Sequence, residues 1–112
     1  PYGAAAMQTL TQLGLGDALS SKFVQGENIG QAYQFVATQN APLGFVALSQ
    51  VYAEGRLTEG SAWMVPETLY EPIRQDALIL AKGKDNTAAA ELMRYLQGDA
   101  AKAVIRSYGY GL

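Results

Sequence analysis

The chain has 112 residues, of which 49% are hydrophobic and 16% charged, so it suits one globular domain and not a disordered chain or a coiled coil. Its formal net charge is −2 and its basic residues are scattered, which argues against nucleic-acid binding through phosphate neutralisation. It contains neither histidine nor cysteine, so disulfides and the common zinc, haem and nucleophilic-triad sites are excluded, and we expect neither an enzyme nor a cofactor.

The first half of the chain predicts two amphipathic helices. Residues 4–14 place Met7, Leu10 and Leu13 at three-residue spacing, and Gly14 ends the pattern. A second helix is expected to follow Asn28, a natural N-cap. Its apolar stripe consists of Ile29, Ala32, Tyr33 and Val36.

Short apolar runs between breakers predict buried strands in the rest of the chain. We expect strands at residues 43–48, 62–65 and 76–81, followed by helices at 87–96 and 100–108. Alternating helices and buried strands favour an α/β fold with a mainly parallel sheet. Three short strands make a narrow sheet, so we expect the chain to be a piece of a larger fold.

Two helix starts are equipped to bind an anion. At the first, Gly3 lets a ligand approach the main chain, and the phenol of Tyr2 can donate a hydrogen bond. At the second, Asn28 caps the helix, and the small Gly30 leaves the first-turn amides open. Unpaired N–H groups and the helix dipole hold an oxyanion without lysine or arginine. The alternative is that both are ordinary helix caps.

A pair of carboxylates offers the one candidate for acid–base chemistry. Glu67 and Glu71 are four residues apart, but Pro72 interrupts any helix, so a solvated loop is the simpler interpretation.

Several runs resemble the molybdate-binding periplasmic proteins of ABC transporters. The most specific run is YEPIRQD at residues 70–76. GENIGQA at 26–32, NAPLGFVALS at 40–49 and the closing YGYG at 108–111 support it, and the likeness extends from Pro1 to Leu112.

The resemblance implies a type II periplasmic-binding-protein fold, in which an oxyanion is caught between two α/β lobes. Family members are about twice as long, so the chain would correspond to a C-terminal half and an incomplete fold. Residues 1–76 would form most of the second lobe, 77–81 a crossover strand, and 82–112 the C-terminal helices that pack on the first lobe.

The resemblance also implies a ligand set. Tyr2 would contact the oxyanion through its main chain and hydroxyl, and Ile29 through its backbone N–H, with Gly3, Asn28 and Gly30 in support. Some members have a ligating tyrosine at the position of Ala47, whose hydroxyl is lost here. No metal ligand is implied, because the oxyanion would be held through Tyr2 and Ile29.

The implied function is solute binding for a molybdate or tungstate importer, with an ABC permease as membrane partner and no nucleic acid. The location would be the periplasm, or the outer face of a Gram-positive cell through a lipid anchor. The isolated chain is expected to dimerise. The alternative is the effector-binding domain of a transcriptional regulator with the same fold.

Overall fold

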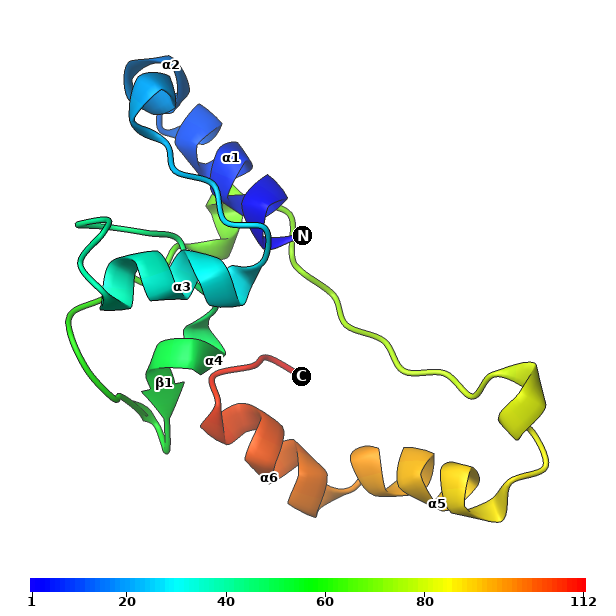
Figure 1. Cartoon of the computed structure of the whole chain (residues 1–112). Helices are drawn as coiled ribbons and strands as arrows, with labels where there is room; N and C mark the ends of the chain where they lie inside the picture. Colours follow the sequence, from blue (N-terminus) through cyan, green and yellow to red (C-terminus); the bar gives the residue numbers. More distant parts are fainter.

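A computed structural model describes all residues, 1–112, as an open assembly of short helices measuring 53 × 30 × 27 Å (Figure 1). The elements in chain order are α1 (Tyr2–Gln12), α2 (Gly16–Leu19), η1 (Ser20–Lys22), α3 (Ile29–Ala37), α4 (Leu48–Val51), β1 (Tyr52–Ala53), β2 (Arg56–Leu57), η2 (Glu67–Leu69), η3 (Ala81–Gly83), α5 (Thr87–Leu96) and α6 (Asp99–Ser107).

Helix α1 begins earlier than the apolar spacing predicts. Pro1 is its N-cap, and the Pro1 carbonyl accepts the first helical hydrogen bond from the amide of Ala5 at 3.1 Å. Of the expected apolar stripe only Leu10 is buried, whereas Met7 and Leu13 are 48% and 43% exposed. The helix therefore packs along a narrow line, against α2 and η2.

Helix α3 confirms the expected start at Asn28. The Asn28 side chain accepts a hydrogen bond from the amide of Gln31, the third residue of the helix. Its predicted stripe is half-buried along the whole length of α3. Capping and patterning therefore agree at this element, which explains why the sequence located it correctly.

The expected parallel sheet is wrong for this chain. Residues 43–48, 62–65 and 76–81 pair with nothing, and the single sheet is an antiparallel pair, β1 with β2, in which Tyr52 faces Leu57. A strand needs a neighbour for its N–H and C=O groups. The apolar composition marks these segments for burial, but the chain supplies no neighbouring strand.

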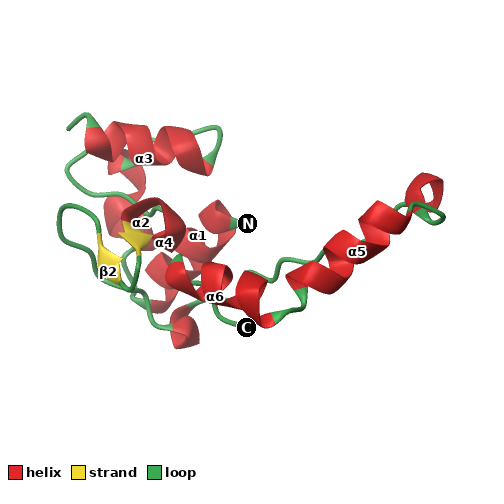
Figure 2. Cartoon of the chain, turned by 90° about the horizontal axis from the view of Figure 1, so that it is seen from below, coloured by secondary structure: helices red, strands yellow, loops and turns green.

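In the second half of the chain, an extended segment leads away from the other helices, and α5 and α6 lead back towards them (Figures 1 and 2). Residues 70–79 make no backbone–backbone hydrogen bond and run extended to η3. This short helix begins at Ala81, which was expected to be the last residue of a strand. Helix α5 has the predicted bounds, and α6 lies one residue earlier than expected. Helix α6 leads back towards α4, which brings the two chain ends into one region (Figure 1).

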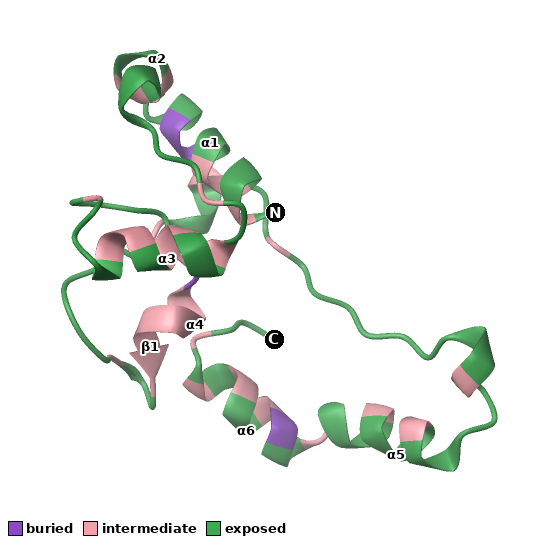
Figure 3. Cartoon of the chain, in the orientation of Figure 1, coloured by how far each residue is buried: buried purple, intermediate pink, exposed green.

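Very little of the chain is buried, as Figure 3 shows. Only four of 112 residues are buried, namely Thr9, Leu10, Ala47 and Ala101. Large apolar side chains stay in solvent, among them Leu78 and Leu80 at 72% and 71% exposed. No helix combines the length and apolar character needed to cross a membrane.

Candidate functional site

The start of α1 presents unpaired amides. Pro1 provides no side-chain cap, and the N–H groups of Tyr2, Gly3 and Ala4 have no partner in the chain. The first turn holds no acidic residue that would offset the positive end of the helix dipole. This end of α1 therefore has several free N–H groups that can donate hydrogen bonds to an anion.

The start of α3 is capped on one side and open on the other. Asn28 Oδ1 accepts a hydrogen bond from the amide of Gln31 at 2.9 Å. Gln31 Oε1 in turn accepts a hydrogen bond from the amide of Glu27 at 2.7 Å. The amides of Ile29 and Gly30 remain without a partner. A Cβ at Gly30 would lie 3.1 Å from Asn28 Oδ1, so the absence of a side chain keeps both the cap and the amides accessible.

Helix α4 fixes the start of α3 through Gln50. The Gln50 side chain donates from Nε2 to the carbonyl of Ile29 at 3.1 Å, and its Oε1 accepts from the amide of Ala47 at 2.9 Å. Both ends of one amide are thus used, so Ile29 is tied to the first turn of α4. Ala47 itself is only 4% exposed, and its methyl group offers no hydrogen bond to a ligand.

A cluster of uncharged polar groups lies between the two chain ends. The Tyr110 hydroxyl is 3.0 Å from Ser49 Oγ. Hydrogen bonding from Ser49, and further from Tyr2 and Gln75, lowers the pKa of Tyr110 against an opposing effect of burial. Burial raises the pKa of Tyr2, and hydrogen bonding to Tyr110 raises it further.

Two hydrogen bonds place α4 between the C-terminal tail and α3. Tyr110 contacts Ser49, and the neighbouring Gln50 contacts Ile29. The structure thus joins the start of α3 to the C-terminal tail through α4.

A hollow of about 230 Å³ lies beside α1, but it does not unite the two ligand positions. Its lining residues are Pro1, Ala4, Ala5, Gln8, Glu71, Pro72, Ile73 and Arg74, without Tyr2 or Ile29. The structure therefore does not bring Tyr2 and Ile29 together across this hollow.

The carboxylate pair does not form an acid–base site. Glu67 begins η2, and Glu71 follows it in extended chain, where its amide donates to Gln8 Oε1 at 2.8 Å. No group of three acidic side chains gathers in a way that could hold a metal ion.

The sequence patterns do not point to the contacts of Ser49, Gln50 and Tyr110. Gln50 occupies the third helical position after Ala47, a capping pattern that could have been recognised without a structure. The contacts of Ser49 and Tyr110 span 61 residues, so no local pattern indicates them.

Comparison with known proteins identifies similar chains. Residues 1–111 match the family described as bacterial extracellular solute-binding protein. The chain is 66% identical over 112 residues to the molybdate-binding protein ModA of Azotobacter vinelandii, covering 100% of this chain and 44% of that protein. It is 50% identical over 111 residues to the ModA of Rhodobacter capsulatus, covering 98% of this chain and 42% of that protein.

A solved structure shows the same fold. The Azotobacter vinelandii periplasmic molybdate-binding protein aligns with a TM-score of 0.89 and 40% identity, covering 100% of this chain and 49% of that one. The expected fold class is therefore confirmed, although the chain spans less than half the length of the curated relatives it matches. The relatives are solute-binding proteins and not enzymes, which confirms the expectation against catalysis.

Proposed function

Since the chain belongs to the bacterial extracellular solute-binding proteins, we propose that it forms part of a receptor that captures molybdate or tungstate for an ABC importer. The observation that carries this proposal is the pair of helix starts with unpaired amides, at Tyr2 and Gly3 in α1 and at Ile29 and Gly30 in α3. The names of the two curated relatives, both molybdate-binding proteins, support the choice of ligand.

The chemistry of this surface suits a dianion that carries no proton. Molybdate and tungstate are tetrahedral dianions at neutral pH, so every oxygen accepts hydrogen bonds and none donates. Backbone amides, a phenol and helix dipoles provide donors without the desolvation cost of burying lysine or arginine. Protonated phosphate would require an acceptor as well, and such a set of donors does not favour it.

Each predicted ligand has a specific part in this proposal. The Tyr2 hydroxyl and main-chain amide donate to one side of the anion, and the Ile29 amide donates to another. Ile29 acts only through its backbone, so its branched side chain is compatible with binding. The alanine at position 47 cannot donate a hydroxyl, so Tyr2 is the one phenol assigned to the anion.

We infer the lobe boundaries from the same comparison. Residues 1–76 form most of one lobe, 77–81 cross between lobes, and 82–112 pack on the other lobe. The unpaired extended segment and the exposed Leu78 and Leu80 support a crossover that pairs with strands outside this chain. Closure of the two lobes around the anion would then signal occupancy to the transporter.

The comparisons also support a location outside the cytoplasmic membrane and a permease as partner. The family consists of extracellular solute-binding proteins, and the related solved structure is that of a periplasmic protein. We therefore place the receptor in the periplasm, where it would deliver the anion to a membrane permease.

Isothermal titration of the full-length protein with molybdate, tungstate and sulfate tests this function. We expect tight binding of the first two and weak binding of sulfate, whose smaller size fits a molybdate cavity poorly. The Tyr2→Phe variant should bind molybdate roughly ten-fold more weakly, because a hydrogen bond to a charged group contributes about 1.5–3 kcal/mol.

Two results would contradict the proposal. The first is full-length protein that takes up neither molybdate nor tungstate. The second is tight binding by the 112-residue chain alone, because the proposal assigns the other ligands to the opposite lobe.

A further inference from the structure

The C-terminal tail packs on α4 through a glycine turn. Gly109 follows α6 with φ of +83°, a conformation that L side chains rarely adopt. A Cβ at Gly109 would lie 2.6 Å from Leu48 Cδ2 and 3.2 Å from Tyr52 Cδ1. The backbone of the turn therefore lies directly against α4 and the residue that follows it.

A side-chain hydrogen bond holds the tail on the same helix. The Tyr110 hydroxyl lies 3.0 Å from Ser49 Oγ, across 61 residues of sequence. Ser49 is the second residue of α4, and Leu48, which meets the glycine turn, is the first. Helix α4 has only four residues, a length that is not stable by itself. Its position therefore depends on the groups that contact it.

The next residue of α4 contacts the start of α3. Gln50 Nε2 donates to the carbonyl of Ile29 at 3.1 Å, and Gln50 Oε1 accepts from the amide of Ala47 at 2.9 Å. The Ile29 carbonyl and the Gly30 N–H belong to one planar peptide group. A hydrogen bond to that carbonyl therefore also orients the Gly30 N–H, which has no partner in the chain.

We propose that Tyr110 is a positioning residue, whose contact with Ser49 fixes α4 and, through Gln50, orients the peptide group between Ile29 and Gly30 for the anion. The inference rests on the proposed function, which assigns the amides at this helix start to anion binding. Donors that are ordered before the ligand arrives reduce the entropic cost of binding. The Tyr110 hydroxyl acts without touching the anion.

A double-mutant cycle in the full-length protein tests the inference. Molybdate is titrated calorimetrically into the wild type, Tyr110→Phe, Gln50→Leu and the double variant. We expect Tyr110→Phe to weaken binding roughly three- to ten-fold when Gln50 is present, and to have no further effect in Gln50→Leu. Tyr108→Phe is the matched control, because Tyr108 is 46% exposed and no side-chain hydrogen bond involves its hydroxyl. Its affinity should equal that of the wild type.

Nitrogen-15 NMR of the anion-free protein reports on the peptide group itself. The Gly30 amide signal should shift in Tyr110→Phe and in Ser49→Ala, because each removes one partner of the contact that fixes α4. The same signal should stay in place in Tyr108→Phe. A change in overall stability alone would not move this signal while the protein remains folded.

The outcomes separate the positioning role from the receptor function. Equal losses of affinity from Tyr110→Phe with and without Gln50, no loss with Gln50 present, or an unmoved Gly30 signal would overturn the positioning role and leave the receptor function in place. A wild type that binds no molybdate would refute the receptor function and the positioning role together. If Tyr110→Phe does not fold, Ser49→Ala should show the same dependence on Gln50, and equal losses in both backgrounds would again overturn the role.

Discussion

The side-chain amide of Gln50 donates to the backbone carbonyl of Ile29 at 3.1 Å, across 21 residues of sequence. Its oxygen accepts from the amide of Ala47, a residue that is only 4% exposed. One side chain thus satisfies the backbone donor of a buried residue and ties the first residue of α3 to the first turn of α4. The position of the Ile29 amide depends on this bridge.

Replacing Gln50 by leucine should therefore reduce both stability and anion affinity. The Ala47 amide would lose its partner, which costs about 1–3 kcal/mol for a buried donor. Urea denaturation of the full-length variant measures the first effect and calorimetric titration with molybdate the second. Gln34→Leu is the control, because Gln34 is exposed on α3 and its side chain makes no hydrogen bond. Equal behaviour of the two variants would contradict the bridging role.

A second prediction concerns the glycine turn before Tyr110. Gly109→Ala should destabilise the protein by about 1 kcal/mol or more, because its φ is positive and the added methyl group meets Leu48. Gly111→Ala is matched to it, since nothing lies within 4 Å of a Cβ there and its φ is not positive. The unfolding midpoint in urea should fall for the first variant alone. A similar midpoint for both would show that the tail does not pack on α4.

The helices could be predicted from sequence because their signals are local. Asn28 and Asn86 each cap a helix with their own side chain, and α5 was predicted with its observed bounds. The apolar spacing of α1 identified the helix but overestimated its buried face, because Met7 and Leu13 have no partner in this chain. Periodicity indicates which face is apolar and not what covers it.

The strands and the polar cluster depend on distant parts of the chain. Residues 76–81 have strand composition, but a ladder requires a neighbour that this chain lacks. The prediction of Tyr2 and Ile29 as ligands rests on a family likeness and on helix-start chemistry. Ser49 and Tyr110 meet only after α6 turns back, so neither propensity nor spacing could show them.

Substitution of the two capping asparagines distinguishes an effect on stability from an effect on anion binding. Asn28→Ala and Asn86→Ala should each cost about 0.5–2 kcal/mol, because each removes a cap that satisfies first-turn amides. Only Asn28 adjoins the proposed anion site, so only Asn28→Ala should also weaken molybdate binding in the full-length protein. Urea midpoints and calorimetric titrations provide both measurements. Equal losses of affinity would place the effect in general stability and not in the site.

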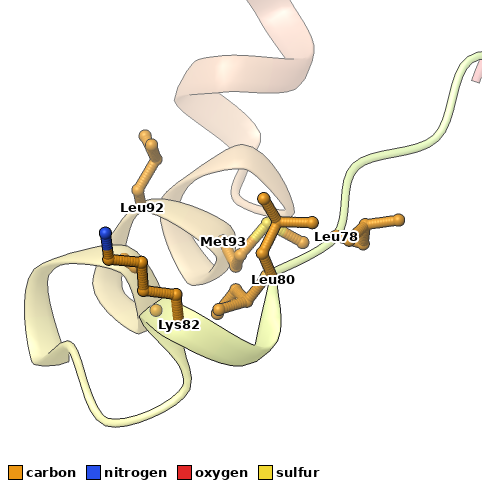
Figure 4. A pocket seen from close by; sticks show the side chains of 8 residues that line it. Leu78, Leu80, Lys82, Leu92 and Met93 are labelled. Atoms are coloured by element: carbon orange, nitrogen blue, oxygen red, sulfur yellow. The ribbon is translucent and has the colours of Figure 1, made fainter.

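The isolated 112-residue chain should associate with itself. Leu78, Leu80 and Leu92 are exposed around a hollow of about 380 Å³ between the extended segment and α5 (Figure 4). Such a continuous apolar surface favours association. Light scattering should show dimers or larger species at high concentration, and the double substitution Leu78→Lys, Leu80→Lys should shift the population towards monomer. A wild-type chain that stays monomeric throughout would contradict this expectation.

The contact between Tyr33 and Glu59 predicts a tyrosine with an unusual titration. The Tyr33 hydroxyl donates to Glu59 Oε1, and this hydrogen bond, together with the negative carboxylate, raises the pKa of Tyr33 above its usual value of about 10. A pKa that is higher in the folded than in the unfolded state gives a stability contribution that is complete below pH 10. That contribution is lost as the pH rises through the folded-state pKa.

Carbon-13 NMR of labelled tyrosine ring carbons measures this pKa directly. In the full-length protein, the Tyr33 signal should titrate above the usual range, and in Glu59→Gln it should move down towards the usual value. Tyr33→Phe assigns the signal by its absence. Glu54→Gln serves as the control, because no side-chain hydrogen bond or ion pair involves that carboxylate and it should leave Tyr33 unchanged. An unaltered Tyr33 titration in Glu59→Gln would show that the hydrogen bond does not persist in solution.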